Sequence, residues 1–184
     1  MLEMNNKTSE EVFSLLDNLL KWTKSQLGKL TVIPQKLDIS GLADGVVEVM
    51  NSVAEVKHIK LIRTDHESFF VYVDIEMIKS ILRNLISNAV KFSNPDSEIK
   101  VGIKAEDGKV IVSVTDSGKG IKKEDQHKLL KDSTHFTTYG TNSEEGSGLG
   151  LLLCRDFARK NGGELWFESE ENLGSVFSFS LPQL

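Results

Sequence analysis

Two pairs of alternating apolar segments set the strongest limit on the fold of this chain. They are Ile99–Ala105 with Lys109–Thr115, joined by Asp107-Gly108, and Glu164–Glu168 with Ser175–Leu181. Period-two alternation around a short turn is typical of a β-hairpin, whose strands are antiparallel. Helical patterns lie between these hairpins. The sequence therefore predicts an α/β (α+β) two-layer sandwich and argues against a doubly wound parallel sheet.

The remaining elements are predicted from caps, breakers and apolar spacing. Three helices are expected. The first is capped by Ser40 and has Leu42, Val46, Val49, Met50 and Val53 at helical spacing. The second runs from its Asp74 cap to Phe92, and the third runs from about Gly148 to Asn161. Short strands are expected at Leu37–Ile39 and, as a strand pair, at Lys60–Arg63 and Phe69–Val73. We therefore expect a mixed, mostly antiparallel sheet covered on one face by three helices, with a further helix at the N-terminus.

The N-terminal helix has a capping box at Thr8 and Glu11 and an end at Gly28. Its apolar stripe consists of Val12, Phe13, Leu15, Leu16, Leu19, Leu20 and Trp22. A stripe this broad either needs a partner helix or packs on the main domain, and periodicity alone leaves both open. Pro34 then interrupts the pattern, so we divide the chain into residues 1–33 and residues 34–184.

Charge and cysteine content exclude several classes of function. The 184 residues include 22 Lys+Arg and 27 Asp+Glu, a net charge of −5, which argues against a nucleic-acid or anionic-membrane surface. The one cysteine, Cys154, excludes a disulfide framework and fits a reducing, cytoplasmic setting. No apolar run approaches the roughly 18 residues that cross a bilayer. We expect no membrane contact by this chain, while a longer parent protein could be membrane-anchored.

A polar face on the Asp74–Phe92 helix is the first candidate site. Asn84, Asn88 and Lys91 fall within an arc of about 60°, opposite the apolar face of the helix. The simple alternative is a solvated face. Asparagine is a mediocre helix former, however, so two of them in mid-helix suggest a purpose. An amide oxygen suits Mg²⁺, and a lysine one turn further on suits a phosphate.

Two glycine-rich segments follow. Asp116-Ser-Gly118-Lys-Gly120-Ile121 comes directly after a strand, where it forms either a plain turn or a close backbone approach to a flat ring. Gly146-Ser147-Gly148-Leu149-Gly150-Leu151 opens the last helix, and helix N-termini of this kind bind anions. The second segment has the spacing GxGxG rather than the GxGxxG of a Rossmann loop, and a Walker loop fails at Gly108-Lys109, which is followed by Val110 instead of serine or threonine.

In this order, the three motifs resemble the N, G1 and G2 boxes of the histidine kinase ATP-binding domain. That domain belongs to a superfamily with gyrase, heat-shock chaperone and mismatch-repair ATPases, and the resemblance covers about residues 34–182. It implies the Bergerat-type fold, ATP and Mg²⁺ as cofactors, and a function in two-component signal transduction. Residues 1–33 resemble the second helix of the dimerisation and phosphotransfer hairpin that precedes such domains.

The resemblance also implies a role for each motif residue. Asn88 would bind Mg²⁺, Lys91 would lie near the phosphates, Phe92 would border the nucleotide, and Asp116 would accept a hydrogen bond from the adenine amino group. Further nucleotide-binding positions flank the base, cradle the phosphates or lie in the ATP lid of about residues 122–147: Gly118, Gly120, Ile121, Phe136, Gly146, Ser147, Gly148, Leu149, Gly150 and Leu151.

Asn84 bears on the type of reaction. Hydrolytic relatives have a glutamate one turn before the Mg²⁺ asparagine, and an amide is a far weaker base. We therefore expect Asn84, Asn88 and Lys91 to support transfer of the γ-phosphoryl group to a protein nucleophile. The acceptor would be a histidine on a dimerisation helix outside this chain, in a homodimer that then passes the phosphoryl group to an aspartate of a response regulator receiver domain.

Two departures from the family pattern leave alternatives. None of His58, His66, His127 and His135 lies in the family's acceptor motif, so we expect an excised fragment that is inactive in autophosphorylation alone. The lid also lacks the basic residue that many relatives have just after the phenylalanine, here Phe136. The alternatives are a non-transferring ATP-binding module (a pseudokinase or scaffold) and an anti-sigma-type serine kinase of the same fold.

Overall fold

The computed structural model describes residues 16, 19–21, 23–25, 27–130, 140–141 and 148–184. Its elements are β1 (Gln35–Asp38), α2 (Ile39–Glu55), β2 (Lys60–Arg63), β3 (Phe70–Val73), α3 (Ile75–Phe92), β4 (Glu98–Glu106), β5 (Lys109–Asp116), α4 (Lys123–Gln126), α5 (Gly150–Lys160), β6 (Leu165–Glu170) and β7 (Gly174–Pro182). Residues 16, 19–21 and 23–25 are helical and end before the turn at Leu27-Gly28.

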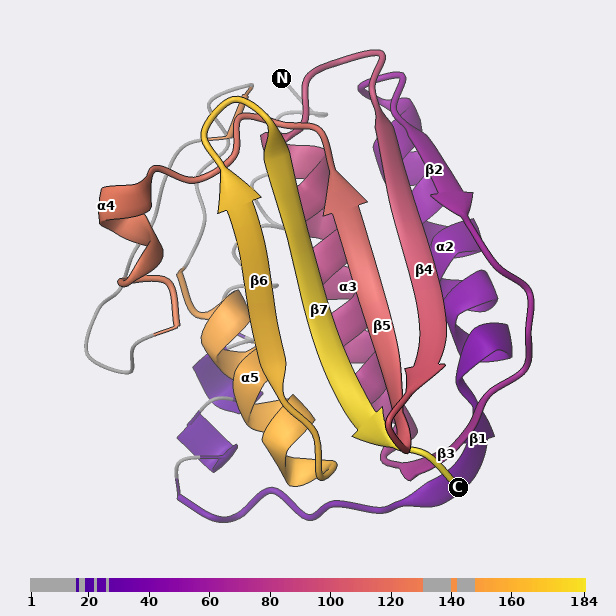
Figure 1. Cartoon of the computed structure of the whole chain (residues 1–184). Coiled ribbons are helices and arrows are strands. Elements are labelled where there is room, and N and C mark those ends of the chain that lie inside the picture. Colours follow the sequence, from indigo (N-terminus) through magenta and orange to yellow (C-terminus); the bar gives the residue numbers. More distant parts are fainter. Residues whose placement is uncertain (1–15, 17–18, 22, 26, 131–139, 142–147) are drawn as a thin grey trace, which may run out of the picture.

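The chain folds into two layers. A five-stranded sheet of order β2-β4-β5-β7-β6 is covered on one face by α2, α3 and α5 (Figure 1). The β2–β4 pair is parallel and the other pairs of this sheet are antiparallel. A small antiparallel sheet of β1 and β3 closes one end. The predicted sandwich, with its mixed and mostly antiparallel sheet under three helices, is confirmed.

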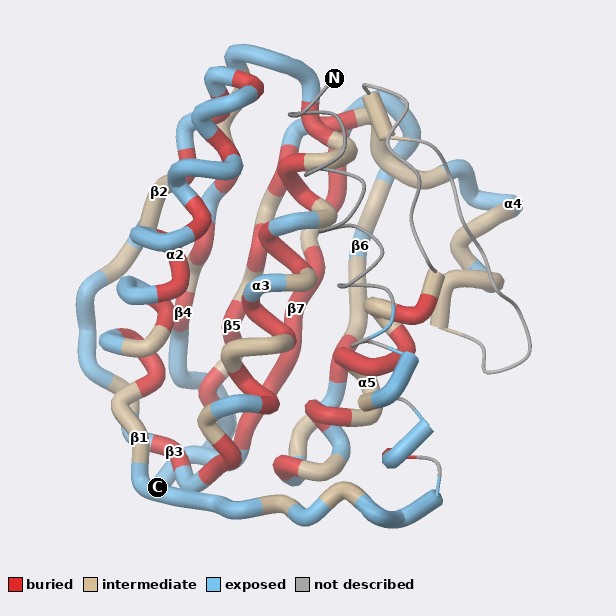
Figure 2. The backbone as a smooth tube through the Cα atoms, turned by 180° about the vertical axis from the view of Figure 1, so that it is seen from behind, coloured by how far each residue is buried: buried red, intermediate tan, exposed pale blue. Residues whose placement is uncertain are grey.

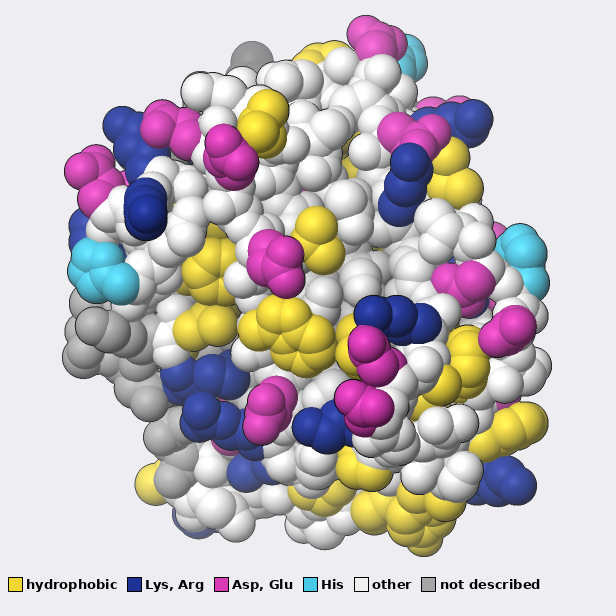
Figure 3. Space-filling view, viewed as in Figure 1, with side chains coloured by type: hydrophobic (Ala, Val, Ile, Leu, Met, Phe, Trp, Pro, Cys, Tyr) yellow, Lys and Arg dark blue, Asp and Glu magenta, His cyan; other side chains and the backbone are white. Residues whose placement is uncertain are grey.

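Buried side chains concentrate between the sheet and the helices (Figure 2). The strands supply the alternating residues of β4, β5 and β7, and α3 supplies the centre of the helical layer. The fully buried members include Ile78, Ile81, Leu82, Ile86, Ile99, Val101, Val110, Val112, Leu153, Phe179 and Leu181. The other face of the sheet carries hydrophobic side chains interspersed with charged ones (Figure 3).

Local signals account for the best-predicted elements. Asp74 caps α3, since its Oδ1 accepts a hydrogen bond from Met77 N at 3.1 Å. The β4–β5 turn has positive φ at both Asp107 (51°) and Gly108 (73°), as a two-residue type I′ hairpin requires. Cys154 is buried in α5, and burial raises the pKa of its thiol.

Three predictions about the first half of the domain are wrong. The cap of α2 is Asp38, which accepts from Ser40 N at 3.1 Å, whereas the Ser40 hydroxyl donates to Glu67 O. The strands β2 and β3 do not pair with each other: β2 pairs with β4 and β3 with β1. Strands of four residues contain little pairing information, so tertiary packing selects the partner.

The third error concerns which face of α2 is buried. Val46 and Met50 are buried as expected, but Val49 is 61% exposed and Val53 is 45% exposed. The buried face instead follows Ile39, Ala43, Val47 and Ala54 beside Val46 and Met50. The predicted apolar face is therefore rotated away from the true one.

The N-terminal helical residues lie beside α5 (Figure 1). The Ser25 hydroxyl is buried and donates to an Asp156 carboxylate oxygen on α5, and Ile33 N donates to Asp74 Oδ2 at 2.9 Å. Leu16, Leu19 and Leu20 nevertheless stay exposed. Both contacts fix the segment to the domain without covering these three leucines, and the division at residue 34 stays a prediction. Within the described ranges, no helix is long and apolar enough to cross a membrane.

Candidate functional site

The candidate site lies along the C-terminal half of α3. Asn84, Asn88 and Lys91 are half-buried on one side of this helix, while its opposite side is in the core. The Asn84 side-chain amide donates to Ser80 O at 2.9 Å. The Asn88 amide makes no hydrogen bond to any described residue, so its oxygen has free lone pairs. A half-buried amide with free lone pairs fits a ligand of Mg²⁺, which prefers hard oxygen donors.

The start of α5 packs against the same part of α3. A Cβ added to Gly150 would lie 2.9 Å from Asn84 Oδ1, so only a glycine fits beside this amide without displacing it. Gly148 and Leu149 precede it, and the side chain of the N-cap residue Leu149 makes no capping hydrogen bond. The N–H groups of a helix start favour an anion such as a phosphate. The predicted N-box and G2-box residues are therefore neighbours; Gly146 and Ser147 lie outside the described residues.

Asp116 ends β5 and is only 7% exposed. Its Oδ1 accepts from Gly118 N at 2.9 Å. Burial raises the pKa of this carboxyl above its ordinary value, and hydrogen bonds from the Gly118 and Ser175 backbone amides oppose that rise. A carboxylate held in a dry position at a strand end is a strong acceptor for an exocyclic amine.

Close backbone approaches explain the glycines around Asp116. A Cβ on Gly118 would lie 2.2 Å from Phe92 O, and Gly120, with φ of 61°, leaves a Cβ only 1.9 Å from Glu170 O. Gly174, which sequence reasoning missed, plays the same part: its Cβ would lie 2.0 Å from Asp116 O. The first contact joins the predicted N and G1 boxes. A position of Gly118 and Gly120 beside a base stays a prediction.

Two ammonium groups flank one aromatic ring at this end of α3. Lys91 Nζ lies 5.0 Å and Lys119 Nζ 4.8 Å from the centre of the Phe92 ring. Both distances are within the range of cation–π attraction, and the pair makes the site locally positive in a chain of net negative charge. Lys119 was not predicted as a site residue, although its place between the two glycines was a usable signal.

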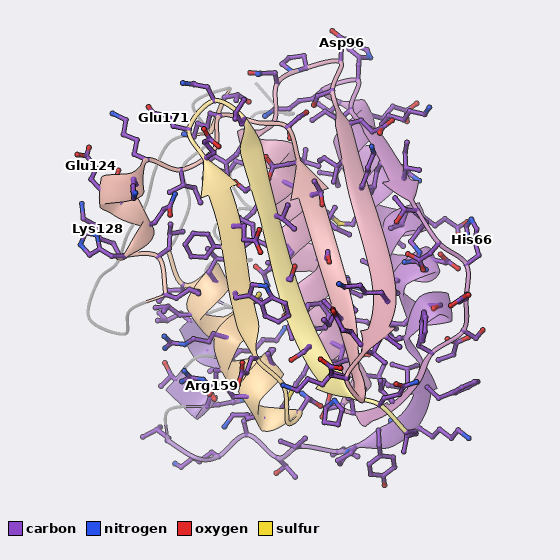
Figure 4. The ribbon with its side chains drawn as sticks, viewed as in Figure 1. His66, Asp96, Glu124, Lys128, Arg159 and Glu171 are labelled. Carbon is purple, nitrogen blue, oxygen red and sulfur yellow. The ribbon has the colours of Figure 1, made fainter. Side chains whose placement is uncertain are left out.

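The neighbouring segments complete this end of the sheet. Ile121 packs against the core, and its carbonyl accepts from Gln126 Nε2 of α4 at 3.0 Å. Leu149 is buried and Leu151 half-buried at the start of α5. Phe136 and His135 lie outside the described residues. His66 lies beside α2, at the opposite edge of the molecule from Glu124 of α4 and from Lys128, which follows α4 (Figure 4).

A groove of about 850 Å³ adjoins the site. It runs along the N-terminal half of α3 under residues 30–35 and reaches Asn84 and Ser87. Lys21 and Arg83 are among its lining residues. Across the described ranges, no group of three or more histidine, cysteine or acidic side chains could hold a metal.

Two sensor kinases are similar to this chain in sequence. The adaptive-response sensory kinase SasA of Crocosphaera subtropica is 35% identical over 170 residues, covering 91% of this chain and 44% of that protein. The sensor protein EvgS of Escherichia coli K12 is 29% identical over 182 residues, covering 95% of this chain and 15% of EvgS. The chain thus spans less than half the length of either relative.

Solved structures share the fold. The catalytic domain of the histidine kinase ThkA superposes with a TM-score of 0.70 and 31% identity, covering 82% of this chain and 96% of that one. Full-length ShkA in complex with AMPPNP has a TM-score of 0.79 and 24% identity, covering 96% of this chain and 37% of ShkA. The family model for the histidine kinase-, DNA gyrase B- and HSP90-like ATPases matches residues 73–184. This chain belongs to that ATPase family.

Proposed function

We propose that this chain is the ATP-binding catalytic part of a two-component sensor histidine kinase. It binds Mg-ATP and transfers the γ-phosphoryl group to a histidine on a dimerisation helix outside this chain. The main support for the proposal is that the three motif segments lie together at α3. Gly150 lies against Asn84, and Gly118 lies against Phe92. The buried Asp116 lies beside Gly118. The sensor-kinase names of SasA and EvgS support it.

Each group then has a defined task. Asp116 accepts from the adenine amino group, the first turn of α5 and Lys91 hold the phosphates, and Asn88 holds Mg²⁺. When bound, Mg²⁺ neutralises charge on the transferred phosphoryl group. Asn84 cannot act as a strong base, which disfavours activation of water. Transfer breaks the bond from the γ-phosphorus to its bridging oxygen, forms a bond from phosphorus to an imidazole nitrogen, and releases ADP and one imidazole proton.

The proposal extends to the parent protein. Its dimerisation helices form a homodimer, and a response regulator receiver domain takes the phosphoryl group from the histidine. The location is cytoplasmic, where ATP is available and Cys154 stays reduced. Residues 1–33 are part of the dimerisation hairpin, and their exposed Leu16, Leu19 and Leu20 are the surface that a partner helix would cover.

The test is phosphotransfer in trans. The chain is mixed with the complete dimerisation hairpin of the parent protein and with ATP labelled at the γ-phosphate. We expect an acid-labile, base-stable phosphohistidine on the hairpin, and we expect Asn88→Ala to abolish it when Mg²⁺ is the metal. Nucleotide binding without any transfer would identify a non-transferring module instead. An acid-stable phosphate would indicate a serine kinase.

A further inference from the structure

The C-terminus of α3 is completed by three segments that are distant in sequence. The last four carbonyls of a helix have no partners within it and need donors from elsewhere. Here Ser93 N donates to Ala89 O at 3.0 Å, and Lys119 N donates to Phe92 O at 3.2 Å. The two carbonyls between them, those of Val90 and Lys91, accept from a lysine side chain. They belong to the turn that carries the proposed phosphate-binding lysine.

That side chain is Lys57, in the turn after α2. The residue is only 6% exposed, which is rare for a lysine. Its Nζ donates to Val90 O at 3.1 Å, to Lys91 O at 3.0 Å and to Thr141 Oγ1 at 2.8 Å. An ammonium group has three donors, enough for these three oxygens. A cation at this position also complements the negative end of the α3 dipole.

Thr141 is the third member of this cluster. Its backbone N donates to Lys91 O at 3.1 Å. Its hydroxyl accepts from Lys57 and lies 2.8 Å from Ser93 O and 3.2 Å from Lys91 O, to either of which it can donate its one proton. Lys91 O therefore receives donors from both Lys57 and Thr141. This arrangement joins Gly140-Thr141 to the last turn of α3 through a buried charge.

We propose that Lys57 and Thr141 form an anchor that positions Lys91 and Phe92 for nucleotide binding. The inference rests on the proposed function, because it assigns a task to the nucleotide-binding end of α3. The hydrogen bonds described for both residues reach the backbone carbonyls of Val90, Lys91 and Ser93, so both act through the last turn of α3. Loss of the ammonium leaves the buried Val90 carbonyl without its lysine donor and leaves Lys91 O with donors from Thr141 alone, which frees the last turn to move.

The experiment combines substitutions at both positions. Lys57→Met removes the ammonium and keeps most of the side-chain volume; Thr141→Val removes the hydroxyl and keeps the shape; Thr141→Ser keeps the hydroxyl. Affinity for Mg-ATP is measured by calorimetry, at a temperature where urea titration shows each variant to be folded. Amide hydrogen exchange at Thr141 reports the anchor itself, without nucleotide. Asn161→Ala is the matched control, because Asn161 Oδ1 accepts from Asp74 N at 2.7 Å at the other end of α3.

We expect Lys57→Met and Thr141→Val each to weaken ATP binding by about tenfold, the scale of one lost hydrogen bond to a charged group. Thr141→Ser keeps the ATP affinity of the parent chain. The loss of ATP affinity in the double variant is smaller than the product of the two single losses, because both residues act in one cluster. The Thr141 amide exchanges faster in Lys57→Met. Asn161→Ala loses stability but keeps its ATP affinity.

Two results would overturn the anchor: unchanged ATP affinity in folded Lys57→Met, or unchanged exchange of the Thr141 amide. A parent chain that binds no ATP would instead refute the proposed function, and the exchange measurement would still decide whether the anchor exists.

Discussion

Replacing Asp116 by asparagine is expected to change stability and nucleotide binding in opposite directions. The ionised carboxylate is buried at the end of β5, and burial raises its pKa, so the folded state holds the charged form at a cost. Asparagine keeps an oxygen for Gly118 N and removes the charge. The free energy of unfolding of the nucleotide-free protein should therefore rise at neutral pH.

The pH dependence follows from the raised pKa. An acid whose folded pKa lies above its unfolded value, here 3.8, lowers stability as pH rises from that value through the folded pKa. Below the unfolded pKa both states are protonated and the penalty vanishes. The stability advantage of Asp116→Asn should thus be small at acidic pH and grow towards neutrality. Glu171→Gln, which removes an exposed charge at the same end of the sheet (Figure 4), should show no such growth.

Nucleotide binding should weaken because the new amide group faces the adenine amine with a donor instead of an acceptor. A lost hydrogen bond to a charged group costs about 1.5–3 kcal/mol, or roughly a 10- to 150-fold rise in Kd. With ATP at a hundred times the parent Kd, the parent gains about 2.7 kcal/mol. For a chain of this size that gain raises Tm by roughly 5–11 °C.

At the same ATP concentration, a hundredfold weaker Asp116→Asn gains only about 0.4 kcal/mol, or roughly 1 °C in Tm. Differential scanning fluorimetry with and without Mg-ATP, at acidic and neutral pH, measures both effects. The reasoning is refuted if the variant is less stable than the parent at neutral pH without nucleotide, or if its ATP-induced rise in Tm equals that of the parent.

Three further substitutions test the packing described above. Gly118→Ala should destabilise the domain by more than about 2 kcal/mol in urea unfolding, because the added Cβ would lie 2.2 Å from the Phe92 carbonyl oxygen. Gly45→Ala, in the middle of α2 with nothing within 4 Å of the added Cβ, should instead stabilise it by about 0.5–1 kcal/mol; a loss would contradict the helix assignment. Leu153→Ala, at a fully buried position on α5, should cost about 2–5 kcal/mol by the same assay, and a surface-like cost below ~0.5 kcal/mol would show that α5 does not pack on the sheet.

The parts of the fold that were predicted correctly depend on local signals. The β4–β5 hairpin is determined by alternation and an Asp-Gly turn, and α3 by its Asp74 cap and apolar spacing. The pairing of β2 with β4 depends on where α2 and α3 place those strands, which no local pattern contains. The face of α2 was misjudged because Ala43 is buried while Val49 is not. Alanines contribute little to a hydrophobic pattern, although they allow close packing.

The candidate site also contains residues that sequence motifs predict and residues that only the tertiary structure shows. Asn84, Asn88, Asp116 and the glycines were identified by motif order, and the structure brings Gly150 to Asn84. The role of Lys57 could not be predicted from the sequence, because its partners are two main-chain carbonyls and a threonine hydroxyl up to 84 positions away. A lysine at the end of a helix is usually a solvated residue, and only tertiary structure shows that this one is buried.

The strand order has a consequence for synthesis on the ribosome. The last strand, β7, lies between β5 and β6, and β6 joins the five-stranded sheet through β7. Until Pro182 has left the exit tunnel, the growing chain exposes the full edge of β5, while β6 has no strand to pair with. Unpaired strand edges in incomplete chains are prone to aggregation, so the nascent domain is most exposed to it between the completion of β5 and the arrival of β7. The domain can therefore complete its fold only after nearly all of its residues have been made.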